Sequence, residues 1–419
     1  MAGEVEFRRE ALPPQAELER EWRALETAAR PSFFTSWHWI GTFLASVPVA
    51  HRPGLLRGVA RGSTVALALL GAGVTRRRHG MIRSRGLYLN ETGDPRFDAL
   101  TIEHNGILAA AGREAAVFDA ALAWFAGKRE EVDELYFSGT SMRPPEQAVE
   151  GRGLGRIETT LPSYSVDLGL LLPSGGELYP VLSANARQQL RRAFRQFERP
   201  GPLRLNEATS AAEASDFFAA LKVLHCAWWE RRGKPHAFTR TFFEPFHRLL
   251  IERSFAEGGT QLVRASAGDR VIGYLYNFRL GSRIYAYQSG FVDADRRERP
   301  GIVTHALAIR HAFRSGATIY DFMAGRNRLK ESLGTRCEPM LWQVFQQPRL
   351  AFRLERLGRR LKHTFDAQKP LPAAQQNDRE IATPGRIGVE LVTQRQEYYV
   401  HSSYRRGRVH WFPCCQGAA

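Results

Sequence analysis

The chain has 419 residues, of which 43% are hydrophobic and 24% are charged, so it can bury a large core and does not have the composition of a disordered protein. Its 59 Lys and Arg against 43 Asp and Glu give a formal net charge of +16. This charge favours an anionic partner such as nucleic acid, a membrane surface or a polyphosphate cofactor. A solvated basic surface explains the charge equally well. Four cysteines are too few for a disulfide framework and lack the paired spacing of a zinc site, so we expect a reducing compartment and no metal.

The first 170 residues predict a mixed α/β unit. Apolar residues at helical spacing indicate helices at residues 17–29, 37–46 and 114–128. Apolar and alternating runs indicate strands at residues 55–61, 64–73, 86–90, 133–138 and 164–168.

The next segment predicts the same kind of unit. Helices are expected at residues 184–196, 212–231, 241–257 and 304–314. Strands are expected at residues 261–266, 271–280, 283–291 and 318–323.

Two stretches share one order of helix and strand. Residues 121–139 read ALAWFAGKREEVDELYFSG, and residues 306–325 read ALAIRHAFRSGATIYDFMAG. We therefore predict two copies of one α/β unit, at residues 1–170 and 171–363, with one continuous mixed sheet as the alternative. Residues 364–419 are polar and predict a linker or tail that is disordered at least in part.

The turn at Arg299-Pro300-Gly301 is the strongest candidate site. It follows an apolar strand and opens a helix, and the free N–H groups of a first helical turn attract a phosphate. We predict that Pro300, Gly301, Ile302 and Val303 hold a phosphate-bearing cosubstrate. Two nearby arginines, Arg297 and Arg299, add positive charge. A plain turn with solvated arginines is the simpler alternative.

Two other segments carry features that suggest binding. The helix expected at residues 184–196 has arginines at four-residue spacing, which suit RNA, lipid head groups or an acidic glycan, although a solvated helix face is favoured. Trp228 lies at a predicted helix end, where it can stack on a substrate, although core packing is favoured.

A group of polar residues surrounds the second strand pair. Asp321 and Asp293 are candidates to take a proton from an acceptor, and Tyr287 is a candidate to protonate a departing thiolate. Tyr285 lies on the same strand face as Tyr287, and Lys330 follows the last strand. Each has a structural alternative, such as packing or capping.

Six segments resemble the CelD/BcsL-type branch of the GNAT acyltransferase superfamily and, more distantly, the FemAB-type peptidyltransferases. In chain order they are PSFFTSWHWIGTF, SYSVDL, ARQQLRRAFRQFE, AWWERRGKPHAF, DADRRERPGIVTHALAIRHA and YDFMAGRNRLKESLG. The resemblance covers residues 5–360 and implies two tandem GNAT-like domains and an acyl-CoA cosubstrate, with acetyl-CoA first among them.

The implied activity is acyl transfer to an amine or hydroxyl of a small-molecule or glycan acceptor in cell-envelope or polysaccharide production. The second domain would be catalytic, and the first structural or acceptor-binding. One alternative is a FemAB-like transferase with an aminoacyl-tRNA donor, and another is a non-catalytic binding protein of the same fold. The most apolar run, residues 65–74, is too short to cross a bilayer, and no signal peptide is recognisable. We therefore expect a cytoplasmic protein. Contact with a membrane surface is the alternative to a freely soluble protein.

Overall fold

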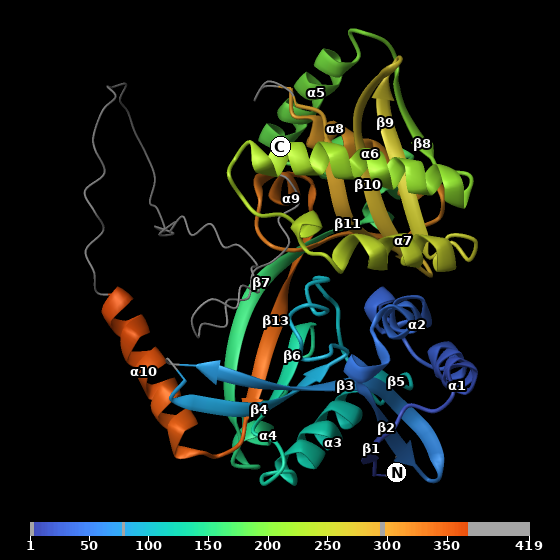
Figure 1. The fold of residues 1–419 in the computed structure, drawn as a ribbon. Coiled ribbons are helices and arrows are strands. Elements are labelled where there is room, and N and C mark those ends of the chain that lie inside the picture. The colour runs from blue at the N-terminus through green and yellow to red at the C-terminus, as the bar shows by residue number, and fades with distance from the viewer. Residues whose placement is uncertain (1–3, 78–79, 294–297, 368–419) are drawn as a thin grey trace.

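A long mixed sheet runs through the computed structural model, which describes residues 4–77, 80–293 and 298–367 (Figure 1). In these ranges the sheet has 13 strands, in the order β1-β2-β3-β4-β6-β13-β7-β12-β11-β10-β9-β8, with β5 paired to β3. The first strands are β1 (Glu6–Glu10), β2 (Gly54–Ala60), β3 (Ser63–Arg77), β4 (Ile82–Leu89), β5 (Leu108–Ala109), β6 (Glu134–Thr140) and β7 (Gly155–Asp167). The later strands are β8 (Leu203–Glu207), β9 (Thr260–Ala267), β10 (Arg270–Leu280), β11 (Arg283–Phe291), β12 (Ile319–Ala324) and β13 (Arg336–Gln346).

Helices cover the sheet on both faces. In the first half they are α1 (Gln15–Thr27), α2 (Trp37–Ser46), α3 (Glu114–Ala126) and α4 (Glu146–Glu150). In the second half they are α5 (Ala184–Phe197), α6 (Ala211–Glu230), α7 (Phe243–Ser254), α8 (Pro300–Arg314), α9 (Arg328–Leu333) and α10 (Leu350–Ala367). None of the helices in the described ranges has the length and apolar composition needed to cross a membrane.

The mixed α/β class predicted from the sequence is confirmed, and the parallel pairs explain the repeated pattern. Strands β4 and β6 are parallel and enclose α3 along the chain, while β11 and β12 are parallel and enclose α8. Parallel neighbours need a crossover connection, which a helix supplies in both halves. The two similar stretches, residues 121–139 and 306–325, are the helix-to-strand parts of these two crossovers.

Strands β7 and β13 join the halves. Strand β7 pairs with β12, and β13 lies between β7 and β6, so a strand from late in the chain completes the sheet of the first half (Figure 1). The boundary expected at residue 170 falls just after β7. Of the tail expected at residues 364–419, residues 364–367 complete α10 and the others lie outside the described residues.

The halves also share a core. Phe33 and Phe34, just before α2, pack on Phe278 of β10, and the rings of Phe33 and Phe278 are stacked with centroids 4.3 Å apart. Helices α6 and α7 lie on this face of the second-half strands, whereas α5 and α8 pack on the other face. First-half residues therefore reach the strands that carry the predicted site.

Candidate active site

Strands β11 and β12 are parallel and separate partway along β11, and helix α8 begins after the carboxyl end of β11. Strands β11 and β12 pair over three positions, from Arg283 opposite Ile319 to Tyr285 opposite Asp321, and β11 then continues to Phe291 without β12. Because α8 connects the two strands, its first turn lies beyond the carboxyl end of β11, the position where open α/β sheets bind ligands.

The first turn of α8 contains most of the predicted phosphate-binding residues. The helix starts at Pro300, four residues before the start expected from the sequence, so Gly301 and Val303 supply first-turn N–H groups, while the N–H of Ile302 donates to the carbonyl of Arg299 at 3.1 Å. Arg299 precedes the helix with a φ of 53°, and its guanidinium donates to the side-chain oxygen of Gln189 on α5. Arg297 lies outside the described residues.

Two buried hydroxyl groups belong to the same region. Ser289 lies near the end of β11 and Thr304 in the second turn of α8, with exposed fractions of 3% and 0%. Neither hydroxyl has a hydrogen-bond partner in the described part of the chain. Buried polar groups are nearly always paired, so two unpaired hydroxyls indicate a place where a ligand supplies the partner.

A β-bulge lies in β11 at Tyr287. Tyr276 of β10 faces Gln288 and the next residue, Asn277, faces Ala286, so Tyr287 is the extra residue. Its side chain is buried, and its hydroxyl donates to the carbonyl of Leu100 in the first half. Tyr285 packs in the same aromatic cluster, and burial raises its pKa to about 12.

Asp321 lies where β11 and β12 part and is 1% exposed. Arg283 donates to its Oδ2 at 2.6 and 3.1 Å, and Nε2 of His104 lies 3.0 Å from the same oxygen. Burial alone would raise the pKa of Asp321, but His104 and Arg283 outweigh it and hold the pKa well below its ordinary value. Asp321 is therefore a permanent carboxylate that can orient His104 and is itself a weak base.

Glu103, next to His104, forms a second buried contact with the end of β12. Its carboxylate accepts a hydrogen bond of 2.6 Å from the backbone N–H of Ala324. The predicted substrate-binding residue Lys330 is 1% exposed, and its ammonium donates to the carbonyls of Met323 and Ala324 at 3.2 and 2.6 Å. Burial raises the pKa of Glu103, although the charge of Lys330 opposes this.

The sequence did not single out Glu103, His104 or Arg283. The loop that carries His104 has no periodic pattern, and a contact between residues 217 positions apart leaves no local trace. One local signal is visible only in the backbone: Thr101 and His104 both have a positive φ, 54° and 49°, and such strain in non-glycine residues clusters at functional sites.

The remaining predicted residues lie elsewhere. Asp293 follows β11 with its side chain 60% exposed and forms an ion pair with Arg231. Trp228 lies half-buried near the end of α6, with the guanidinium of Arg232 stacked 3.3 Å from its ring centroid. The structure therefore brings Asp321, Tyr285 and Tyr287 together and keeps Asp293 at the surface.

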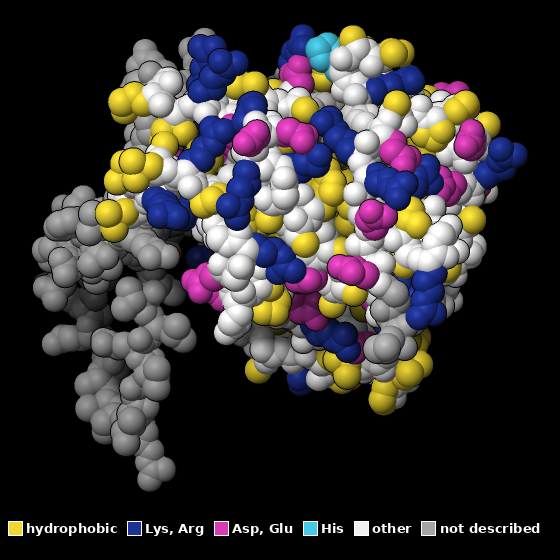
Figure 2. Space-filling view, turned by 90° about the horizontal axis from the view of Figure 1, so that it is seen from below, with side chains coloured by type: hydrophobic (Ala, Val, Ile, Leu, Met, Phe, Trp, Pro, Cys, Tyr) yellow, Lys and Arg dark blue, Asp and Glu magenta, His cyan; other side chains and the backbone are white. Residues whose placement is uncertain are grey.

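The arginine-rich helix α5 buries Leu190, Phe194 and Phe197 against the sheet. Arg192 and Arg195 are exposed, while Arg187 donates to the carbonyl of Leu182. On the face shown in Figure 2, Lys and Arg side chains are dispersed and alternate with Asp and Glu. The excess positive charge therefore does not form a single patch on that face.

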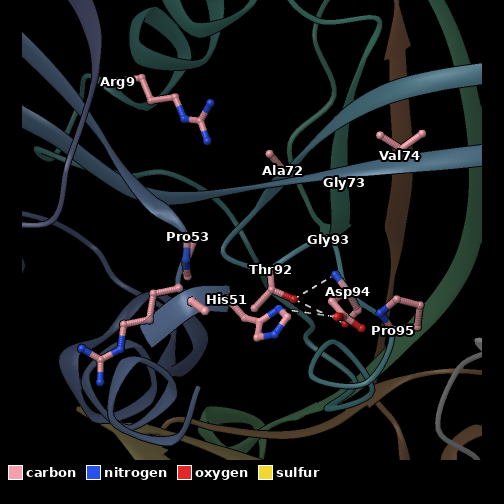
Figure 3. A pocket seen from close by; sticks show the side chains of 12 residues that line it. Arg9, His51, Pro53, Ala72, Gly73, Val74, Thr92, Gly93, Asp94 and Pro95 are labelled. Carbon is pink, nitrogen blue, oxygen red and sulfur yellow. Dashed lines mark hydrogen bonds and ion pairs between the residues drawn. The ribbon is translucent and has the colours of Figure 1, made fainter. Parts of the chain in front are cut away.

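The first half contains a separate cavity of about 530 Å³. Arg9, His51 and Arg52 contribute its basic groups and Asp94 an acidic one, with His51 Nδ1 3.7 Å from Asp94 Oδ2 (Figure 3). A mixed set of charges around a hollow of this size suits a polar small molecule.

Residues 184–331 match the family model of the acetyltransferase (GNAT) domain. The matched segment runs from the start of α5 into α9 and includes β11, the start of α8 and β12. The protein therefore contains a GNAT-type acetyltransferase domain and is a transferase.

Several solved structures are similar to most of the chain. FemX is 12% identical, with a TM-score of 0.53, and the match covers 84% of this chain and 99% of FemX. L-PGS from Bacillus licheniformis is 10% identical, with a TM-score of 0.46 and coverage of 84% and 97%. A tandem GNAT protein from the clavulanic acid biosynthesis pathway is 13% identical, with a TM-score of 0.40 and coverage of 81% and 98%. No curated protein sequence matches the chain.

Proposed function

We propose that the protein transfers an acyl group from acyl-CoA, with acetyl-CoA as the first candidate, and that the pyrophosphate binds at the start of α8. The observation that carries this proposal is the first turn of α8, which lies beyond the carboxyl end of β11, a strand that parts from its parallel neighbour β12, and which belongs to the segment that matches the GNAT domain. Ser289 and Thr304, whose buried hydroxyls lack partners, are the groups that we expect the bound cosubstrate to satisfy.

The transfer is direct attack of the acceptor on the thioester. The acceptor nitrogen or oxygen bonds to the acyl carbon, the carbon–sulfur bond breaks, and the CoA thiolate leaves with the electron pair. We propose that His104 is the base that takes the proton from the acceptor. Asp321 faces Nε2 of His104, so Nδ1 of His104 remains to act as the base. Tyr287 remains the candidate to protonate the thiolate, once its hydroxyl releases the carbonyl of Leu100.

Calorimetric titration with acetyl-CoA and longer acyl-CoAs tests the donor. The change Gly301→Leu fills the first turn, and Arg299→Ala removes a nearby charge with a smaller effect on packing. Both should raise the Kd at least tenfold, while Gly358→Ala, in α10 with open space around it, should leave the Kd unchanged. Equal affinity in all of these folded variants would reject the proposed phosphate position.

The proton transfer is tested separately, by the release of CoA with an amine acceptor that turns over. His104→Gln should lower kcat by about 10²–10⁴-fold and leave the Kd for acyl-CoA unchanged, since general-base catalysis contributes about that much. Asp293→Asn should have little effect, because Asp293 is exposed and paired with Arg231. The opposite ranking of these two variants would move the base to Asp293.

The acceptor is proposed from the resemblance to the CelD/BcsL branch: a glycan or other cell-envelope precursor, modified in the cytoplasm or at the membrane surface. Trp228, Tyr285 and Lys330 are the proposed acceptor-side residues of the second half. In the first half the cavity beside Arg52 suits an acceptor-binding role, and Arg52→Ala should raise the KM for the acceptor without changing that for acyl-CoA.

A FemAB-like transferase with an aminoacyl-tRNA donor is the second candidate, favoured by the exposed arginines of α5. It requires tight RNA binding that weakens steeply with salt and that Arg192→Ala with Arg195→Ala reduces. Acyl-CoA binding without RNA binding would exclude it, and a folded protein that binds neither would be a non-catalytic module.

A further inference from the structure

The end of α6 and the segment after it bring three potential metal ligands together. Cys226 and Glu230 lie one helical turn apart on α6, and His236 lies in the segment that follows the helix. One ligand atom from each residue lies within 4.8 Å of the other two. Cys226 Sγ is 3.9 Å from His236 Nδ1, and His236 Nε2 is 3.7 Å from a Glu230 oxygen.

A histidine gives a cation one nitrogen, so either Nδ1, beside Cys226, or Nε2, beside Glu230, would be the ligand atom of His236. Zinc binds sulfur at about 2.3 Å and nitrogen or oxygen at about 2.0–2.2 Å in tetrahedral geometry, which places neighbouring ligand atoms about 3–4 Å apart. The side chain of His236 is 6% exposed and so has little room to move. The side chain of Glu230 is 68% exposed and can rotate toward Cys226.

His225, the residue before Cys226, supplies an independent observation. It is 3% exposed, its Nδ1 lies 2.9 Å from the carbonyl of Ser289, and its Nε2 has no hydrogen-bond partner in the described part of the chain. The His225 and His236 rings are 5.8 Å apart between centroids. His225 is not one of the three residues whose ligand atoms converge, and its buried nitrogen is a candidate neighbour of a metal-bound water.

We propose that Cys226, Glu230 and His236 form a binding site for a zinc-type divalent cation. The donor set selects the class of metal, because a thiolate with an imidazole and a carboxylate suits zinc and is unsuited to magnesium or calcium. The sequence alone did not predict this site, because the site has one cysteine, whereas zinc motifs usually contain two paired cysteines.

The cation would fasten the segment after α6 to the helix itself. This segment begins at Arg231, which pairs with Asp293 at the end of β11, and His225 contacts the carbonyl of Ser289 on β11. The metal would therefore stabilise one side of the region around the end of β11, whichever acyl donor binds there. Metal binding displaces the thiol proton of Cys226, so it should weaken as the pH falls.

The test uses full-length protein titrated with Zn²⁺ and with Co²⁺ as a spectroscopic probe. The tail contains His401, His410, Cys414 and Cys415, which can bind metal as well, so the reference protein carries Cys414→Ser and Cys415→Ser. We expect it to bind one equivalent of metal, to show a cobalt–thiolate absorption band and to unfold at a higher temperature with Zn²⁺.

Adding Cys226→Ser to this reference should remove the thiolate band and the stabilisation by Zn²⁺, and His236→Ala should weaken binding at least tenfold. The matched control is Cys337→Ser, which removes an exposed cysteine outside the cluster and should change neither quantity. The unfolding temperatures without metal show whether each variant folds. Absence of metal binding by the folded reference, or a thiolate band that survives Cys226→Ser, would overturn the proposal.

Discussion

Two neighbouring carboxyl groups next to the cavity of the first half make the stability of this protein depend on pH. Glu91 is buried and Asp98 half-buried, and Asp98 accepts hydrogen bonds of 2.7–2.8 Å from the N–H groups of Thr92 and Gly93 and the Thr92 hydroxyl. Burial raises the pKa of Asp98 to about 7 despite these bonds, and burial together with the charge of Asp98 raises that of Glu91.

A pH dependence follows from the raised pKa of Asp98. Between about pH 4 and about pH 7 the folded protein holds a proton on Asp98 that the unfolded chain has lost, so the free energy of unfolding falls as the pH rises through this range. The slope is at most about 1.4 kcal/mol per pH unit for one carboxyl. Asp98→Asn should reduce this fall, because an amide does not titrate.

Urea unfolding at about pH 5 and about pH 8 measures the effect. The difference in the free energy of unfolding between the two pH values should be smaller in Asp98→Asn than in the wild type. The control is Asp269→Asn, which changes an exposed carboxyl in the turn between β9 and β10. A wild-type difference that Asp98→Asn leaves intact would mean that Asp98 is ionised in the folded protein.

At the scale of elements, close approach between β11 and α6 depends on a missing side chain. A Cβ on Gly290 would lie 2.4 Å from the carbonyl oxygen of Leu221 in α6. This oxygen belongs to the helix backbone, so it cannot move aside as the end of a flexible side chain could. Gly290→Ala should therefore lower the free energy of unfolding by about 1–3 kcal/mol, as overpacking does. Thermal and urea unfolding measure the change.

Gly358→Ala is the matched control for Gly290→Ala, since a Cβ at Gly358 meets nothing within 4 Å and alanine favours a helix. This variant should be neutral or slightly more stable. A Gly290→Ala protein as stable as the control would show that α6 and β11 can move apart without cost.

Helix α10 is held to the sheet of the first half by a buried ion network. Arg77 at the end of β3 donates to both oxygens of Glu134 on β6, at 2.8 and 2.7 Å, and to Glu355 on α10 at 3.2 Å. Arg77→Met would remove the cation that these two buried carboxylates share, and breaking a buried ion pair in this way costs about 3–5 kcal/mol in comparable cases. We expect this loss in urea unfolding, and a much smaller one for Arg8→Met, whose ion pair with Glu6 is exposed.

The helices and strands of the sequence prediction lie close to their observed places wherever an apolar pattern marks them. The pattern failed for β13, although Met340, Leu341 and Val344 are buried, because the first positions of that strand are polar and exposed. It also gave no information on His104, which reaches Asp321 only because the first half folds against β12. Local patterns thus predict the elements and a helix that starts within four residues of Pro300, whereas the contact between His104 and Asp321 depends on tertiary structure.

At the scale of the whole molecule, the interleaving of the halves argues against independent folding. Strand β13 pairs with β6 from Gln346 opposite Glu134 to Leu341 opposite Thr140, and with β7 along all eleven of its residues. A first half without β13 would expose the edges of both strands and the side chain of Phe345, which is 0% exposed in the intact protein. Unpaired edges and uncovered apolar side chains favour aggregation over folding.

Residues 1–170 expressed alone should therefore fail to fold, whereas the same residues joined through a flexible linker to residues 336–349 should recover part of the sheet. Circular dichroism and urea unfolding distinguish the two: we expect no cooperative transition for the first protein and one for the second. The intact chain should unfold in a single transition, because Phe33 and Phe278 also join the halves in one core. If residues 1–170 unfold cooperatively by themselves, β13 is an addition to a finished domain, and the contact of His104 with Asp321 is then a docking contact between two independent domains.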